Sequence, residues 1–160
     1  MKQKINKTIL FFLLIFISLI LIFAYTIEYK LGFEACKLCI YQRVPYFLSI
    51  LLIIEILFFK KYEKITLLLL SFIFFISLIL AFYHFGIEQG FFDESTVCAS
   101  GDILNTLNKE ELLQELKKNT ISCKNVNFKI LGFSLASINV ILSFIFSVIF
   151  MKMFLNYGKN

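Results

Sequence analysis

Two cysteines separated by two residues form the most reactive pattern in the sequence. Cys36 and Cys39 open the run Cys-Lys-Leu-Cys-Ile-Tyr-Gln-Arg, which ends in Arg43, the only arginine of the chain. Such a pair closes and reopens a small disulfide ring by thiolate exchange, and a nearby guanidinium favours the reactive thiolate. The same spacing occurs in zinc sites. The position of the pair in the fold therefore has to decide between redox chemistry and metal binding.

The composition places these cysteines in a membrane protein. Of the 160 residues, 59% are hydrophobic and 18% are aromatic, with a single proline, which is not the balance of a water-soluble domain. The net charge of +5 comes from lysines in small groups beside apolar runs, without the contiguous basic face that nucleic-acid binding requires. We expect an all-α membrane protein and no nucleic-acid partner.

Four apolar runs are long enough to cross the hydrocarbon core of a bilayer. They cover about residues 9–27, 40–59, 65–83 and 130–155. The first run exceeds a typical signal-peptide core and has no small-residue cleavage site after it, so we expect it to be retained as a span. The sequence thus predicts a single integral membrane domain of residues 1–160, built as a four-transmembrane-helix bundle.

Two polar loops, about residues 28–39 and 84–129, are predicted to share one side of the membrane. The basic turn at 60–64 is so short that the second and third spans must be antiparallel neighbours. That arrangement brings His84, the single histidine, to the membrane face that carries Cys36 and Cys39. A lone histidine at an interface also serves as a structural hydrogen-bonding residue, so both roles stay open.

Lysines predict the orientation of the bundle. Eight of them lie in the two short tails and in the 60–64 turn, which the positive-inside rule assigns to the cytoplasm. The cysteine loops carry nearly as many basic residues, but these are spread through a long loop among nine acids, and long loops count little for orientation. All four cysteines would then lie in outward loops, in an oxidising compartment where disulfides form. A disulfide between Cys36 and Cys39 closes too small a ring to stabilise the fold much, which favours a redox switch. A structural zinc site with four cysteine ligands is the less favoured alternative.

The long loop holds the other two cysteines, Cys98 and Cys123. A disulfide between them would close a loop large enough to stabilise the fold, so a purely structural bond remains a serious alternative. Leucines and isoleucines recur at near-helical spacing over 102–118 among polar residues. This pattern predicts an amphipathic helix lying in the membrane interface, with a soluble helix over a small loop core as the alternative.

A dithiol at the edge of a membrane suits a lipid-soluble acceptor of two electrons, and a quinone is the obvious candidate. The sequence has no haem-attachment motif and no glycine-rich dinucleotide motif. We predict that Cys39, nearer the bilayer, reacts with the quinone. Arg43 is four residues along, on the same helix face, and its guanidinium would stabilise the Cys39 thiolate and the developing quinone oxyanion.

The chain resembles the DsbB family of bacterial inner-membrane, quinone-dependent disulfide oxidases. The resemblance is carried by residues 36–43, by Tyr83-His84 with Gly86-Ile87-Glu88, by the cysteines of the long loop, and by Ile130-Leu131-Gly132-Phe133-Ser134-Leu135-Ala136. The second loop of this chain lacks the proline and the tryptophan that are common in that family.

The resemblance implies a role for each site residue. Cys36 and Cys39 would be the pair coupled to ubiquinone or menaquinone, with Arg43 and His84 near the quinone. Cys98 and Cys123 would oxidise a periplasmic DsbA-like protein of thioredoxin fold, with Cys98 forming the mixed disulfide. No metal is implied.

Three alternatives remain open at the level of sequence. In vitamin K epoxide reductase-like proteins the membrane-proximal Cys-x-x-Cys follows the loop pair, whereas here it comes first. A paralogous oxidase that serves one dedicated substrate is a second alternative. A non-catalytic bundle held together by disulfides is the third.

Overall fold

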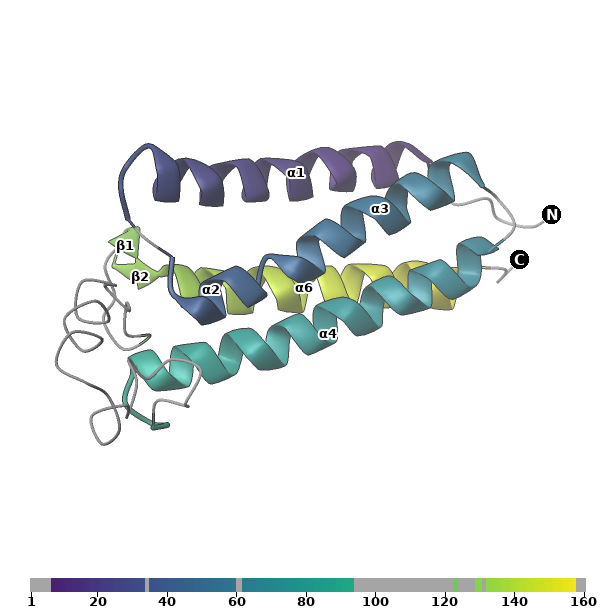
Figure 1. Ribbon diagram of the computed structural model, residues 1–160. Helices are drawn as coiled ribbons and strands as arrows, with labels where there is room; N and C mark the ends of the chain where they lie inside the picture. Colours follow the sequence, from purple (N-terminus) through teal and green to yellow (C-terminus); the bar gives the residue numbers. More distant parts are fainter. Residues whose placement is uncertain are drawn as a thin grey trace, which may run out of the picture.

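The computed structural model describes residues 7–33, 35–59, 62–93, 123, 129–130 and 132–157. Its elements are α1 (Lys7–Tyr29), α2 (Lys37–Tyr41), α3 (Val44–Phe58), α4 (Glu63–Glu88), β1 (Lys129–Ile130), β2 (Phe133–Ser134) and α6 (Leu135–Asn156), as drawn in Figure 1. The two strands pair antiparallel and are two residues long each. The predicted amphipathic helix at 102–118 lies outside the described residues.

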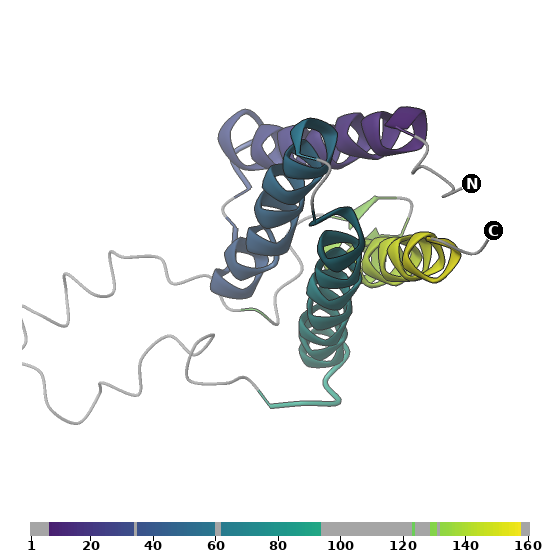
Figure 2. The same ribbon diagram turned by 90° about the vertical axis from the view of Figure 1, so that its right-hand side faces the viewer.

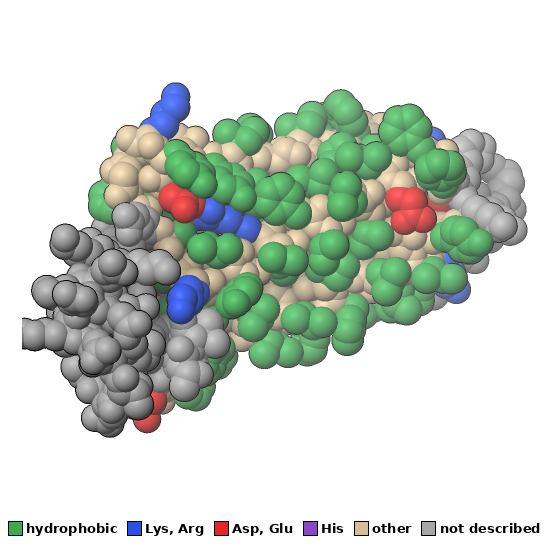
Figure 3. Space-filling model, viewed as in Figure 1, with side chains coloured by type: hydrophobic (Ala, Val, Ile, Leu, Met, Phe, Trp, Pro, Cys, Tyr) green, Lys and Arg blue, Asp and Glu red, His purple; other side chains and the backbone are tan. Residues whose placement is uncertain are grey.

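Four stretches of the described chain are long and apolar enough to cross a membrane: Lys7–Tyr29, Lys37–Phe58, Glu63–Glu88 and Leu135–Asn156. Their outward faces carry large exposed hydrophobic side chains along their whole length. In Figure 3 hydrophobic side chains cover the middle of the visible face, and the charged ones lie toward its two ends. Such a surface is suited to lipid, which confirms the predicted all-α membrane bundle of four spans.

The spans run up and down through the bundle. At one end, the Lys7 ammonium group donates to the Leu57 carbonyl at 3.2 Å, which ties the start of α1 to the end of α3. At the same end, the Tyr157 hydroxyl donates to Glu63 at 3.2 Å, which ties the end of α6 to the start of α4. Figure 1 shows the start of α1 and the end of α6 at this end, with α2 at the opposite one.

Helices α4 and α6 form the most extensive helix pair, and α3 contacts both α1 and α4. Figure 2 gives the end-on view of this arrangement. Aromatic rings fill the centre: Phe74 stacks on Phe150 and contacts Phe146, while Tyr46 meets Phe74 edge to face. Serines lie between α4 and α6, where the Ser77 and Ser143 hydroxyl oxygens are 3.0 Å apart. Small hydroxyl residues of this kind let two membrane helices approach closely.

Two helix boundaries differ from those expected. Helix α4 continues past residue 83 to Glu88, so His84 lies within the helix and not in the loop after it. The helix ends where Gly90 adopts a φ of 77°, a conformation that glycine adopts without strain. Helix α6 begins at Leu135 and not at residue 130, because the Ser134 hydroxyl caps it by accepting from the Ser137 N–H at 3.1 Å.

The second span also differs from the continuous helix expected over 40–59. It starts earlier, at Lys37, and is divided into α2 and α3 by a turn at Gln42 and Arg43. Pro45 explains the division, because it has no N–H to bond the carbonyl of residue 41 and its ring disfavours a helix running through that position. At the start of α3 the same proline is well tolerated.

Candidate functional site: a dithiol beside a buried histidine

The cysteine pair is formed by the first turn of α2. Cys36 is the N-cap of this helix, and its sulfur accepts a hydrogen bond from the Cys39 backbone N–H at 3.2 Å. The two-residue spacing makes Cys39 the third helical residue, whose N–H points back to the cap. The two sulfurs lie 2.6 Å apart, and both cysteines are free. The helix turn therefore holds two thiols where little movement would join them.

The two thiols are not equivalent. Cys36 is buried, whereas Cys39 is half-buried. The pKa of Cys36 is lowered to about 5, chiefly because the Cys39 thiol donates a hydrogen bond to it. His84 contributes to the same lowering, and burial opposes it. Cys36 is thus the thiol of the pair that ionises more readily. The reaction of Cys39 with a quinone stays a prediction.

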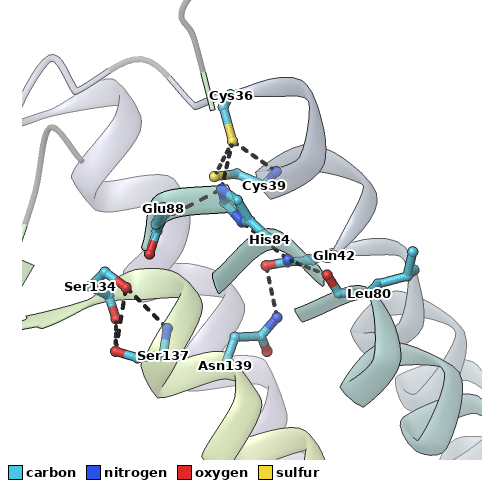
Figure 4. A network of polar contacts seen from close by, with 9 residues as sticks. All are labelled: Cys36, Cys39, Gln42, Leu80, His84, Glu88, Ser134, Ser137 and Asn139. Carbon is cyan, nitrogen blue, oxygen red and sulfur yellow. Dashed lines mark hydrogen bonds and ion pairs between the residues drawn. The ribbon is translucent and has the colours of Figure 1, made fainter. Parts of the chain in front are cut away.

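His84 comes from the last turns of α4 and is 2% exposed. Its Nε2 atom lies 3.6 Å from the Cys36 sulfur and 3.7 Å from Oε1 of Glu88, one turn further along the same helix. Its Nδ1 atom lies 3.2 Å from Nε2 of Gln42. Figure 4 shows the ring between the cysteine pair and the Gln42 amide. The predicted proximity of His84 to the cysteines is therefore present in the structure.

Arg43 lies on a different side of the α2–α3 turn. Its guanidinium group forms an ion pair with Glu28 near the end of α1 and lies 4.7 Å from the centre of the Tyr25 ring. The face that Cys39 and Arg43 are predicted to share is crossed by the turn between α2 and α3, and the shared face stays a prediction. Arg43 thus connects α1 to the turn that follows the cysteines.

Two residues of the site have no counterpart in the predictions from sequence, Gln42 and Asn139. The Asn139 amide nitrogen donates to Oε1 of Gln42 at 2.9 Å, which links α6 to the turn after α2 (Figure 4). Tyr46 and Ser143 in turn donate to Oδ1 of Asn139. Gln42 follows Cys39 by three residues, and this spacing could have placed it near the cysteine pair on sequence alone. Asn139 lies 97 residues further along, where no local pattern points to the cysteines.

The long loop contributes one described cysteine. Cys123 is 2% exposed and takes part in a disulfide. It packs in one buried cluster with Cys36, Leu38 and Ile87, against which Cys39 also lies. Cys98 lies outside the described residues. The structure therefore brings part of the loop pair to the membrane-proximal pair.

A metal ion would find three candidate ligands in the same place. The ligand atoms of Cys36, Cys39 and His84 lie within 4.8 Å of one another. A closed structural zinc site takes four ligands, and within the described chain this cluster offers three. These atoms alone are consistent with either thiol exchange or metal binding.

Comparison with known proteins decides the family. The model of the family "Disulfide bond formation protein DsbB" matches residues 6–153. The chain belongs to the DsbB family. A protein of Rickettsia prowazekii (strain Madrid E), described as "Uncharacterized protein RP370", is 34% identical over 161 residues, which cover 99% of this chain and 93% of that protein. No solved structure matches the chain. Membership of the DsbB family indicates a disulfide oxidoreductase.

Proposed function

We propose that the chain is a quinone-dependent disulfide oxidase that re-oxidises a DsbA-like, thioredoxin-fold dithiol protein in the periplasm. One observation carries the proposal: a free dithiol lies at one end of a four-span bundle, packed in one buried cluster with the disulfide-bonded Cys123. A pair of thiols beside a disulfide is the arrangement that thiol–disulfide exchange requires. Membership of the DsbB family supports the same reaction class.

In this scheme electrons move inward through two exchanges. The dithiol of the soluble partner reduces the disulfide between Cys98 and Cys123, and Cys98 forms the mixed disulfide. The resulting loop dithiol then reduces the disulfide between Cys36 and Cys39. Each exchange breaks one disulfide and forms another, so electrons and protons balance. Closing the Cys36–Cys39 disulfide again releases two electrons and two protons, which ubiquinone or menaquinone accepts to become the quinol.

The surroundings of Cys39 fit a hydrophobic acceptor. Cys39 is half-buried and lies on α2, within the second apolar span. Its neighbours Ile40, Tyr41 and Val44 are about half exposed and give the site an apolar approach. The Cys36 sulfur is buried and lies 2.6 Å from the Cys39 sulfur, so the two would form the disulfide while the quinone takes up the two electrons and two protons. His84 borders the same site. Arg43, through its ion pair with Glu28, fixes the position of the site relative to α1.

We further propose that the protein lies in the bacterial inner membrane with both chain ends in the cytoplasm. The lysines at the two chain ends and in the 60–64 turn support this orientation through the positive-inside rule. The cysteines would then face the periplasm, which is kept oxidising.

The proposal is tested by reconstituting the purified protein in lipid with a quinone and a reduced thioredoxin-fold dithiol protein. We expect oxidation of the partner and formation of quinol in equal amounts. The Cys98→Ser variant is the matched control, because it should stop electron entry from the partner while leaving Cys36 and Cys39 able to react with quinone. Absence of quinol formation with every candidate quinone would refute the proposal.

Thiol trapping in cells deprived of quinone distinguishes an oxidase from a protein whose cysteines have a purely structural role. An oxidase accumulates reduced cysteines under that condition, whereas a structural disulfide stays closed. The reconstituted assay, repeated with several reduced partner proteins, distinguishes a general oxidase from one dedicated to a single substrate.

A further inference from the structure

The buried amide network at the site has one member whose hydrogen-bonding role is unambiguous. The Leu80 carbonyl oxygen can only accept, and the Gln42 Nε2 atom lies 3.4 Å from it. The opposite orientation of the amide would place two acceptor oxygens together, which is costly for a buried side chain such as Gln42. The nitrogen of Gln42 must therefore face α4, as drawn in Figure 4.

Asn139 hydrogen-bonds the Gln42 amide in the same orientation from the other side. Its Nδ2 donates to Oε1 of Gln42 at 2.9 Å. Its own Oδ1 accepts from the hydroxyl groups of Tyr46 and Ser143, and its nitrogen faces Gln42. The contact with Leu80 on α4 and the contact with Asn139 on α6 are thus both satisfied when the nitrogen of the Gln42 amide faces α4 and its oxygen faces α6.

This orientation determines the tautomer of His84. The donor nitrogen of Gln42 also faces Nδ1 of the ring, at 3.2 Å. A proton on Nδ1 would set two N–H groups against each other around a ring that is only 2% exposed. The lone pair is therefore on Nδ1 and the proton on Nε2. Nε2 in turn faces the Cys36 sulfur at 3.6 Å and a Glu88 carboxylate oxygen at 3.7 Å, both of which accept when ionised.

We propose that Gln42, oriented by Asn139 and by the Leu80 carbonyl, is a positioning residue that holds His84 as its Nε2–H tautomer, so that the ring donates to the Cys36 thiolate. The inference deepens the proposed function, because it names what keeps Cys36 reactive. It also counts against metal capture, since ligation through Nε2 would need the proton on Nδ1, where Gln42 presents a donor.

The tautomer is directly measurable because the chain has a single histidine. The full-length protein, labelled with ¹⁵N at histidine and reduced at Cys36 and Cys39, gives one pair of ring nitrogen signals. We expect a protonated Nε2 and an unprotonated, hydrogen-bonded Nδ1. A protonated Nδ1 in the wild-type protein would overturn the inference without any variant being made.

Substitutions then test whether Gln42 is the cause. Gln42→Leu removes the donor, and we expect the Nδ1 signal to lose its hydrogen-bond shift. We expect alkylation of Cys36 at about pH 4, where the thiolate is the minor form, to slow about tenfold, which is the value of one hydrogen bond to a charged group. Asn139→Leu does not touch the ring and should slow alkylation less, about threefold. Gln89→Leu is the matched control, because Gln89 is an exposed glutamine just beyond the end of α4, the helix that carries His84.

Unchanged ring signals and an unchanged Cys36 rate in Gln42→Leu would also overturn the inference. Neither measurement uses quinone or a partner protein. Failure of the inference is therefore distinguishable from failure of the proposed function, which is judged by quinol formation alone.

Discussion

Gln42 and Arg43 are adjacent in the chain, yet they serve opposite sides of the α2–α3 turn. Gln42 is 7% exposed and faces inward, to His84 and Asn139. Arg43 faces α1, where it pairs with Glu28. The inward side is an amide and imidazole network next to the sulfurs, and the outward side is a salt bridge.

The difference follows from the cost of burying charge. An arginine among the helices would need a buried partner to offset the loss of hydration, whereas neutral amides need only matched donors and acceptors. The Arg43–Glu28 pair therefore lies at the edge of the bundle, and the amides of Gln42 and Asn139 lie between α2, α4 and α6. Reactivity at the cysteines is set by hydrogen-bond direction on the inward side, while Arg43 fixes the relation of α1 to the site.

The largest effect is expected from Cys39→Ser. This change keeps a hydroxyl donor for Cys36 but removes the sulfur needed to close the disulfide, so turnover with quinone and a dithiol partner should fall to background. The measurement is the steady-state rate of quinol formation. Substantial activity in this variant would show that the inward side of the turn is not the redox centre.

A strong pH effect is expected at Cys36. Its pKa is lowered to about 5 by the Cys39 thiol and by His84, so the thiolate persists well below the usual range for cysteine. Alkylation of Cys36, followed by mass spectrometry, should stay nearly constant from neutral pH down to about pH 6 and fall about tenfold by about pH 4. A fall already centred near pH 8 or 9 would contradict the assignment of the thiolate to Cys36.

Arg43 provides the test of the outward side. Arg43→Lys keeps the charge but loses the planar fork that pairs with Glu28, and we expect the apparent KM for quinone to rise about fivefold, corresponding to about 1 kcal/mol. Glu28→Gln should raise it similarly if Arg43 acts by fixing α1. An effect in Arg43→Lys alone would instead indicate that the guanidinium contacts the quinone directly.

The smallest effect is expected in the middle of the bundle. Ser77 and Ser143 join α4 and α6 away from the cysteines, so Ser77→Ala should lower the free energy of unfolding by about 0.6 kcal/mol. Thermal unfolding in detergent measures this, and the rate of quinol formation should stay unchanged. A loss of rate would mean that the polar network of the site extends further into the membrane than the inward side of the turn.

Four apolar runs predict the four spans because length and hydropathy suffice to identify a membrane helix. The helix ends are less predictable. His84 and Glu88 are polar, and sequence assigns them to a loop, but the buried cysteine cluster at this end of the bundle gives them partners and α4 continues through them. Pro45 signals the break between α2 and α3, although its effect on the direction of Arg43 depends on where Glu28 lies.

The cysteines and His84 were identifiable from residue type and from the order of the spans. The role of Gln42 was not, because it depends on Asn139 from the fourth span and on the Leu80 backbone carbonyl. Hydrogen-bond partners that are distant in sequence leave no periodic pattern. Sequence therefore predicted the reacting atoms better than the groups that orient them.

The most direct test of the account is a single turnover without any partner protein. The protein, reduced at Cys36 and Cys39 and held in lipid without oxygen, is mixed with one equivalent of quinone. The account predicts one quinol per protein and a new disulfide between Cys36 and Cys39, also in the Cys98→Ser variant. Quinol formed while Cys36 and Cys39 both remain alkylatable would contradict it.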